Sequence, residues 1–239
     1  MEEFLREYYS LLTHGVEFMA AVTGLFLLSK YKHTAVKYFI YFLVYVVFVE
    51  LIGSYPIYLV NFDFLSEIKE IVNSTVFKYN YWWYNIFWTL GSMFFYSFYY
   101  HKILENKVFK RILKYATFLA LVISLILIFS DLDAFFARTN IIISLSGTII
   151  VLLCVLFYFI EMLNSDKILT FHRSFNFYVS ATNLIWWLAT VPLTFYGMYN
   201  ITEDMDFVFL KWKIMLGSNI FMYSTFTFAL IWCRPRQDK

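Results

Sequence analysis

Apolar residues occur along the chain in seven blocks of about 20 residues, separated by short polar segments. A helix of this length crosses roughly 30 Å of hydrocarbon at 1.5 Å per residue. Within hydrocarbon every backbone polar group needs a partner in its own segment, so helices are predicted rather than strands. The predicted spans are 9–28, 36–60, 81–100, 112–129, 141–160, 175–199 and 209–232. The pattern therefore predicts a single all-α domain over 1–239, a bundle of seven transmembrane helices.

Composition strengthens this prediction. Hydrophobic residues make up 61% of the chain and charged residues only 15%, against roughly a quarter charged in ordinary soluble proteins. The first block follows an acidic start and is interrupted by His14 and Glu17. It lacks the basic flank and unbroken apolar run of a signal peptide, so it is expected to remain as a helix of the mature protein.

The distribution of basic residues predicts the orientation. Thirteen of the 19 Lys and Arg residues fall in the connections after the first, third and fifth spans and in the C-terminal tail. Basic residues favour the cytoplasmic side, so the N-terminus is expected outside and the C-terminus in the cytoplasm of a bacterial inner membrane. The segment "HKILENKVFKRILK" is expected to rest on anionic lipid of the inner leaflet. This charge pattern gives no indication of nucleic-acid binding.

Two further patterns concern the arrangement of the spans. Phe64, Leu65, Ile68, Ile71 and Val72 recur at helical spacing in the longest outer connection, which predicts a short amphipathic helix, either an interfacial cap or a lid over an outer cavity. Leu-Gly-Ser occurs at 90–92 and again at 216–218. Together with one proline near the outer end of the second and sixth spans, this match suggests a parallel repeat of three plus one plus three helices.

Polar residues inside the spans are the candidates for function. A charge in mid-membrane costs about 2.5–3.5 kcal/mol, so such side chains usually face the bundle interior. His14 and Glu17 share a helix face in the first span, and Glu50 lies near the middle of the second. Asparagines and lysines occur at compatible outer or middle depths on other spans: Asn85, Asn183, Asn219, Lys211 and Lys213.

The prolines extend this candidate site. Pro56 and Pro192 each remove a backbone donor and are expected to break their helices, leaving carbonyl groups for water, a side chain or a ligand. An outward-opening pocket lined by residues 81–85, with Trp83, and by Trp186 and Trp187 would give these groups partners. Such a pocket suits an apolar or planar small ligand with few polar anchors.

A structural interpretation is left open for each of these residues. Glu17 and Lys213 or Lys211 could form a buried ion pair, and His14 could bond between helices. Glu50 could be a protonated acid bonded to a carbonyl, and the lysines could reach the surface. The tryptophans could belong to an interfacial belt.

Known catalytic and metal motifs are absent. The sequence contains no HExxH, no GxSxG, no glycine-rich phosphate loop and no cysteine pair at metal spacing. Cys154 and Cys233 are expected to fill the core. No enzyme activity, cofactor or metal is predicted.

The stretches "FVELIGSYPIYL" and "YNIFW" resemble small uncharacterised seven-helix membrane proteins of Bacteroidota, some of which accompany two-component sensors. The resemblance implies ligand sensing, with the signal read by a cytoplasmic or membrane partner. The alternative is proton-coupled transport of a small solute by rocking of two three-helix units. Rhodopsins are disfavoured because Lys211 and Lys213 lie too near the outer end of the last span for a retinal Schiff base.

Overall fold

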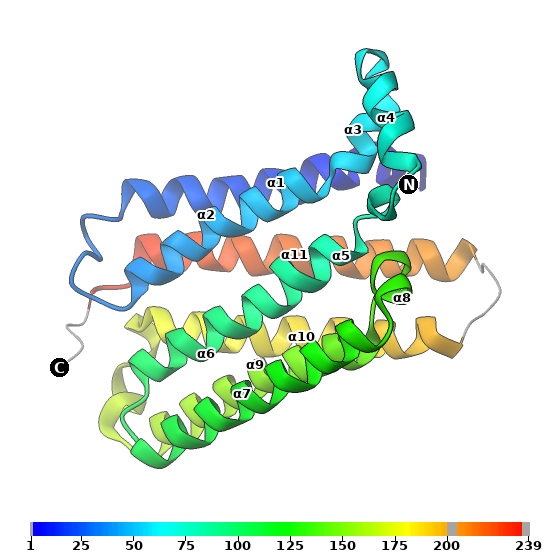
Figure 1. The fold of residues 1–239 in the computed structure, drawn as a ribbon. Coiled ribbons are helices and arrows are strands. Elements are labelled where there is room, and N and C mark those ends of the chain that lie inside the picture. Colours follow the sequence, from blue (N-terminus) through cyan, green and yellow to red (C-terminus); the bar gives the residue numbers. More distant parts are fainter. Residues whose placement is uncertain (1, 200–204, 236–239) are drawn as a thin grey trace. The chain divides into compact units, whose positions relative to one another are not determined.

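The structure is a computed structural model, and it describes residues 2–199 and 205–235. These residues contain eleven α-helices and no strand, which confirms the all-α class (Figure 1). The helices are α1 Glu2–Phe26, α2 Val36–Gly53, α3 Tyr55–Asn61, α4 Ser66–Asn73, α5 Tyr81–Trp83, α6 Gly91–Ile103, α7 Lys107–Ser130, α8 Leu132–Ala137, α9 Ile141–Leu163, α10 Phe175–Tyr199 and α11 Met205–Trp232. A π-helical segment, η3, covers Tyr84–Leu90, and 3-10 turns cover Asp63–Leu65, Val76–Lys78 and Asp166–Arg173.

Four of these helices, α2, α7, α9 and α11, are long and apolar enough to cross a membrane. The other three predicted spans are helical but differ in character. His14 and Glu17 make α1 more polar, and Asn176 and Asn183 do the same for α10. The third span is divided into α5, η3 and α6, which follow one another without a gap. Seven membrane crossings and the predicted repeat stay predictions.

The second predicted span differs from expectation. It was predicted as one helix over 36–60, but α2 ends at Gly53 and α3 starts at Tyr55. Ser54 between them bonds back to the Glu50 carbonyl through both its backbone N–H (3.0 Å) and its hydroxyl (2.9 Å). Pro56 lies in the first turn of α3, where a missing N–H costs nothing. Pro56 therefore begins a new helix and does not interrupt the old one.

The second expected helix break is wrong. Pro192 lies inside α10, which continues to Tyr199. A proline removes one donor and can kink a helix, but a helix in a packed or apolar setting often persists through it. The Thr190 hydroxyl donates to the Trp186 carbonyl at 2.9 Å in the turn before the proline.

The described chain forms two compact units. The first contains the residues up to Val44 and from Tyr158 onward, and the second is Tyr45–Phe157. In the first unit α11 packs against both α1 and α10 (Figure 1). Phe39, near the start of α2, packs edge-on against Phe175 of α10 and Phe226 of α11, with ring centroids 5.3 and 5.0 Å apart.

The C-terminal end of α11 is held by the connection after α1. The Tyr31 hydroxyl lies 2.9 Å from the Leu230 carbonyl and 3.0 Å from that of Cys233. Lys30 Nζ donates to the carbonyls of Leu230 and Ile231, both at 3.0 Å. These bonds satisfy carbonyl groups that lack partners in the last turn of a helix.

The second unit is built on α6, α7 and α9. Thr117 on α7 donates to Ser97 on α6 at 2.8 Å, and Phe109 on α7 stacks on Phe157 of α9 at 4.5 Å between centroids. The predicted amphipathic helix is confirmed as α4, preceded by a 3-10 turn. The short α8, which the hydrophobic pattern did not predict, contributes Phe136 to an aromatic cluster with Phe77 and Trp82.

Candidate functional site

Carbonyl groups at the break between α2 and α3 are bonded by side chains from the start of the third predicted span. Asn80 Nδ2 donates to the Gly53 carbonyl at 2.7 Å. Trp83 Nε1 donates to the Val49 carbonyl at 2.9 Å. The sequence predicted exposed carbonyls and a ligand-lining aromatic run here. In the structure, Trp83 is itself a partner of one of these carbonyls.

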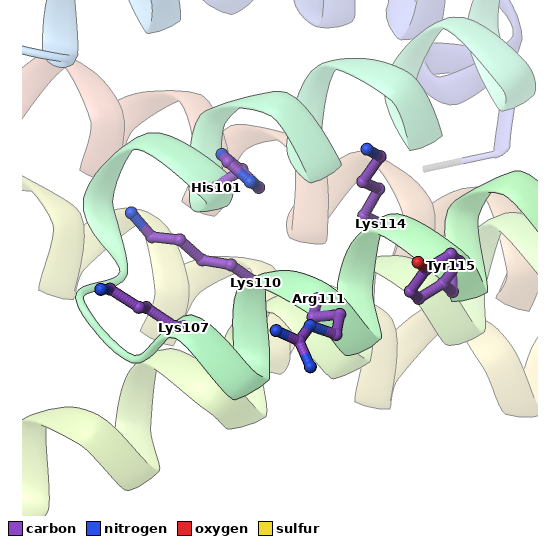
Figure 2. Close-up of a pocket in the computed structure, with 6 residues that line it drawn as sticks. All are labelled: His101, Lys107, Lys110, Arg111, Lys114 and Tyr115. Carbon is purple, nitrogen blue, oxygen red and sulfur yellow. The ribbon is translucent and has the colours of Figure 1, made fainter.

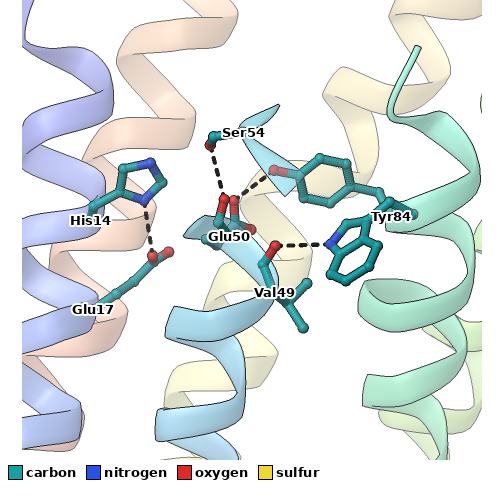
Figure 3. A network of polar contacts seen from close by, with 7 residues as sticks. His14, Glu17, Val49, Glu50, Ser54 and Tyr84 are labelled. Carbon is teal, nitrogen blue, oxygen red and sulfur yellow. Dashed lines mark hydrogen bonds and ion pairs between the residues drawn. The ribbon is translucent and has the colours of Figure 1, made fainter. Parts of the chain in front are cut away.

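Glu50 lies at the same break. Its Oε2 accepts a hydrogen bond from the Tyr84 hydroxyl at 2.9 Å (Figure 3). The approach depends on Gly53, because a Cβ there would lie 2.9 Å from both Trp83 Cδ1 and Tyr84 Cζ. Side-chain atoms do not come so close, so only glycine lets these two aromatic rings pack on the end of α2. The result is a carboxyl group held by a phenol beside a helix end.

The π-helical segment forms the other half of this site. A π-helix pairs each N–H with a carbonyl five residues earlier, and π segments often occur at functional sites. The Tyr45 hydroxyl on α2 donates to the Phe87 carbonyl inside η3. A Cβ on Gly91 would overlap that hydroxyl. Gly91 therefore provides the space in which Tyr45 reaches the π segment.

Asn85 follows Tyr84 on the π segment and is 1% exposed. Within the described part of the chain, its Nδ2 is one of three buried side-chain polar atoms without a hydrogen-bond partner; the others are Thr13 Oγ1 and Ser92 Oγ. A buried donor without a partner costs about 1–3 kcal/mol. Asn85 is thus a buried amide whose donor has no partner among the described residues.

We call this set the break site. It consists of Glu50 and Tyr84, with Asn80, Trp83, Tyr45 and the two glycines Gly53 and Gly91 that shape it. Asn85, the next residue after Tyr84 on the π segment, is counted with it. The sequence singled out Glu50, Trp83 and Asn85. It missed the roles of Asn80, Tyr84 and Tyr45, although Gly-Ser-x-Pro at 53–56 was a usable signal for the end of a helix.

His14 and Glu17 belong to the other unit. His14 Nδ1 lies 3.4 Å from Glu17 Oε2 (Figure 3), as expected for residues three apart on a helix. Glu17 is buried, at 3% exposure. A protonated imidazole would make this contact an ion pair. Convergence of this pair with Glu50 in one pocket stays a prediction.

Of the remaining candidates in the first unit, two contact each other. Trp186 Nε1 on α10 donates to Asn219 Oδ1 on α11 at 2.8 Å. Asn183 is buried and donates to the Val179 carbonyl of its own helix at 2.8 Å. Lys211 and Lys213 are exposed. Trp186 and Asn219 thus join two helices, whereas Asn183 bonds within one helix and the two lysines lie at the surface.

A pocket of about 290 Å³ lies at the start of α7 (Figure 2). It is lined by His101, Lys107, Lys110, Arg111, Lys114 and Tyr115. Partial burial and the charges of Lys110, Lys102 and Lys114 keep the pKa of His101 below its usual value. The sequence predicted a basic lipid-facing segment here, but not a pocket.

Among the described residues, no group of three or more His, Cys, Asp or Glu side chains could hold a metal ion. The break site combines a carboxyl group, a phenol and an amide, which are donors and acceptors of hydrogen bonds. Comparison with family models, with curated proteins and with solved structures finds no match to this chain.

Proposed function

We propose that this protein is a seven-span integral membrane protein, with its N-terminus outside, that binds a small ligand at the break site and passes the signal to a partner. The observation that carries this proposal is the Glu50–Tyr84 bond at 2.9 Å beside the broken end of α2. A membrane-embedded carboxyl group at a helix discontinuity is a functional candidate by default.

The chemistry of the site defines the ligand class. Asn85 Nδ2 offers a donor, the Glu50 carboxyl group offers an acceptor, and Trp83 offers an aromatic surface. A planar molecule with one hydrogen-bond acceptor and one amino or hydroxyl group satisfies all three. Binding would change the packing between the α2–α3 break and the π segment, which is the element able to switch.

A ligand screen tests the proposal. Purified protein in nanodiscs is screened by thermal unfolding against small aromatic amines, alcohols and carboxylic acids. An aromatic amine or alcohol is expected to raise the unfolding temperature of the wild type. Glu50→Gln and Asn85→Leu are expected to lower the affinity for that compound about tenfold or more, because each removes a polar group proposed to contact the ligand.

Glu67→Gln is the matched control, since Glu67 is an exposed acid on α4. Tyr84→Phe tests the hydroxyl group alone, since it removes the bond to Glu50 but keeps the packing of the ring on Gly53. If the three break-site variants bind every active compound as tightly as the wild type does, the proposal is wrong.

The alternative is proton-coupled transport, in which Glu50, the acid beside the broken end of α2, would be the group that takes up the proton. Proteoliposomes under an imposed pH gradient would then accumulate solute, and Glu50→Gln would abolish this accumulation. If accumulation is lost in Glu50→Gln but kept in Glu67→Gln, the function is transport and the sensing proposal is wrong.

A further inference from the structure

Basic side chains line the pocket at the start of α7, although this end of a helix favours negative charge. Lys107 and Lys110 lie in the first turn, which contains no acidic residue. The N-terminus of a helix carries a partial positive charge and favours anions. Arg111, Lys114 and His101 add to the same cavity. Four cationic side chains in the first two turns of α7 are unfavourable together unless an anion lies between them.

Glu105 and Asn106, in the connection between α6 and α7, do not line the pocket. Asn106 caps α7 by accepting from the Val108 and Phe109 N–H groups at 2.8 and 3.4 Å. Glu105 is exposed. Figure 2 shows the lining side chains coming from the end of α6 and the first turns of α7. Four of the six lining side chains are Lys or Arg, and the other two are His101 and Tyr115.

The surface beyond the pocket is apolar. Arg111, Tyr115 and Phe118 are spaced four and three residues apart, so they lie on one face of α7. Tyr115 is 65% exposed and Phe118 63% exposed. This helix is one of the four that could cross a membrane. We call Tyr115 and Phe118 the apolar stripe. The acyl chains of a lipid could pack along it, whereas a soluble anion has no apolar part that would.

We propose that this pocket binds the phosphate group of an anionic phospholipid, with Lys107, Lys110 and Lys114 around the phosphate and the acyl chains along the apolar stripe through Tyr115 and Phe118. The bound phosphate offsets the repulsion among the basic side chains. The site differs from general attraction to an anionic leaflet because it depends on particular lysines and not on their number.

The test measures binding of dihexanoyl phosphatidylglycerol, dihexanoyl phosphatidylcholine and inorganic phosphate to the purified full chain in neutral detergent by calorimetric titration. Phosphatidylglycerol is expected to bind to the wild type more tightly than either of the others. Lys110→Gln combined with Lys114→Gln is expected to weaken phosphatidylglycerol binding about tenfold or more. Lys110→Arg with Lys114→Arg is expected to retain it.

The matched control is Lys32→Gln with Lys102→Gln. It removes two exposed lysines from the same predicted side of the membrane, and neither lines the pocket. Equal weakening in this control overturns the proposal, since binding would then follow net charge alone. Inorganic phosphate that binds as tightly as phosphatidylglycerol also overturns it, because the occupant would be a free anion.

The pKa of His101 gives a second measurement of phosphate binding, since it would not change if the pocket bound no anion. In the free protein partial burial, and after it the charges of nearby lysines, lower the pKa of its imidazole; a bound anion opposes the effect of the lysines. The pKa measured by NMR is expected to rise when phosphatidylglycerol is added to the wild type. No rise on addition of saturating lipid would contradict the placement of the phosphate beside His101.

Discussion

Single side chains explain the distortions of the helices in the second unit. Tyr45 supplies a hydroxyl donor to the Phe87 carbonyl inside the π segment, and Gly91 leaves room for it. Gly53 similarly admits the rings of Trp83 and Tyr84. In both places the absence of a Cβ atom leaves space for a tyrosine hydroxyl that any larger residue would block.

The two glycines of the Leu-Gly-Ser motif give a direct test of this view. Gly91→Ala is expected to destabilise the protein by about 1–3 kcal/mol, because the new Cβ overlaps the Tyr45 hydroxyl. Gly217→Ala, the control, has no neighbouring atom within 4 Å and is expected to be neutral or stabilising by up to about 1 kcal/mol. Unfolding in detergent measures both. Equal effects would mean that Gly91 provides no needed space.

Cys233 gives a prediction about pH. It is 0% exposed, and burial raises the pKa of its thiol to about 11, partly opposed by the charge of Lys30. Only the thiolate reacts, so labelling by a maleimide in a Cys154→Ser background is expected to be slow at neutral pH. The rate should increase as pH rises toward 11, and unfolding at pH 7.5 should restore fast labelling. Fast labelling of the folded protein at pH 7.5 would contradict this burial.

At the scale of the elements, the end of α2 depends on side chains from a distant part of the chain. Asn80 and Trp83 bond the carbonyls of Gly53 and Val49. Asn80 replaces the Ile57 N–H that a continuing helix would direct to the Gly53 carbonyl and that here bonds to Ser54, and Trp83 adds a bond to a carbonyl in the last turn of α2. The break is therefore a defined feature of the fold.

Removing these partners should loosen the break. Asn80→Ala and Trp83→Phe are each expected to cost about 1 kcal/mol and to speed hydrogen exchange of the amides at 53–58 other than Pro56, which has no N–H. Asn73→Ala on the exposed face of α4 is the control. Unchanged exchange at 53–58 in both variants would show that Ser54 alone maintains the break.

The elements also show what sequence reasoning could and could not predict. Long apolar runs predicted helices at all seven places, because hydrophobic length is a local property. The break at Ser54 and the bonds to residues 80–84 depend on contacts between distant segments. Asn85 was predicted as a site residue from its polarity, but its partnerless donor follows only from packing. The pocket at α7 required the side chains of two helices.

At the scale of the whole molecule, the proposed topology is testable by labelling. Single cysteines at exposed positions 74, 102, 133 and 169 are expected to alternate between the outer and inner sides, beginning outside. A membrane-impermeant maleimide should therefore label positions 74 and 133 in intact cells, and 102 and 169 only after permeabilisation. Cys154 and Cys233 are both 0% exposed and give little background. Two successive positions labelled from the same side would reduce the number of crossings.

The helix end at Ser54 has a consequence for the bilayer. With 18 residues, α2 is about 27 Å long, slightly less than the roughly 30 Å of a typical hydrocarbon layer. The 28 residues of α11 reach about 42 Å. If both helices cross one membrane, the long helix tilts or extends its polar end into the headgroup region, while the short one draws its polar end inward or thins the lipid around it. On the proposed function, lipids of longer chain length are then expected to alter ligand affinity around Glu50.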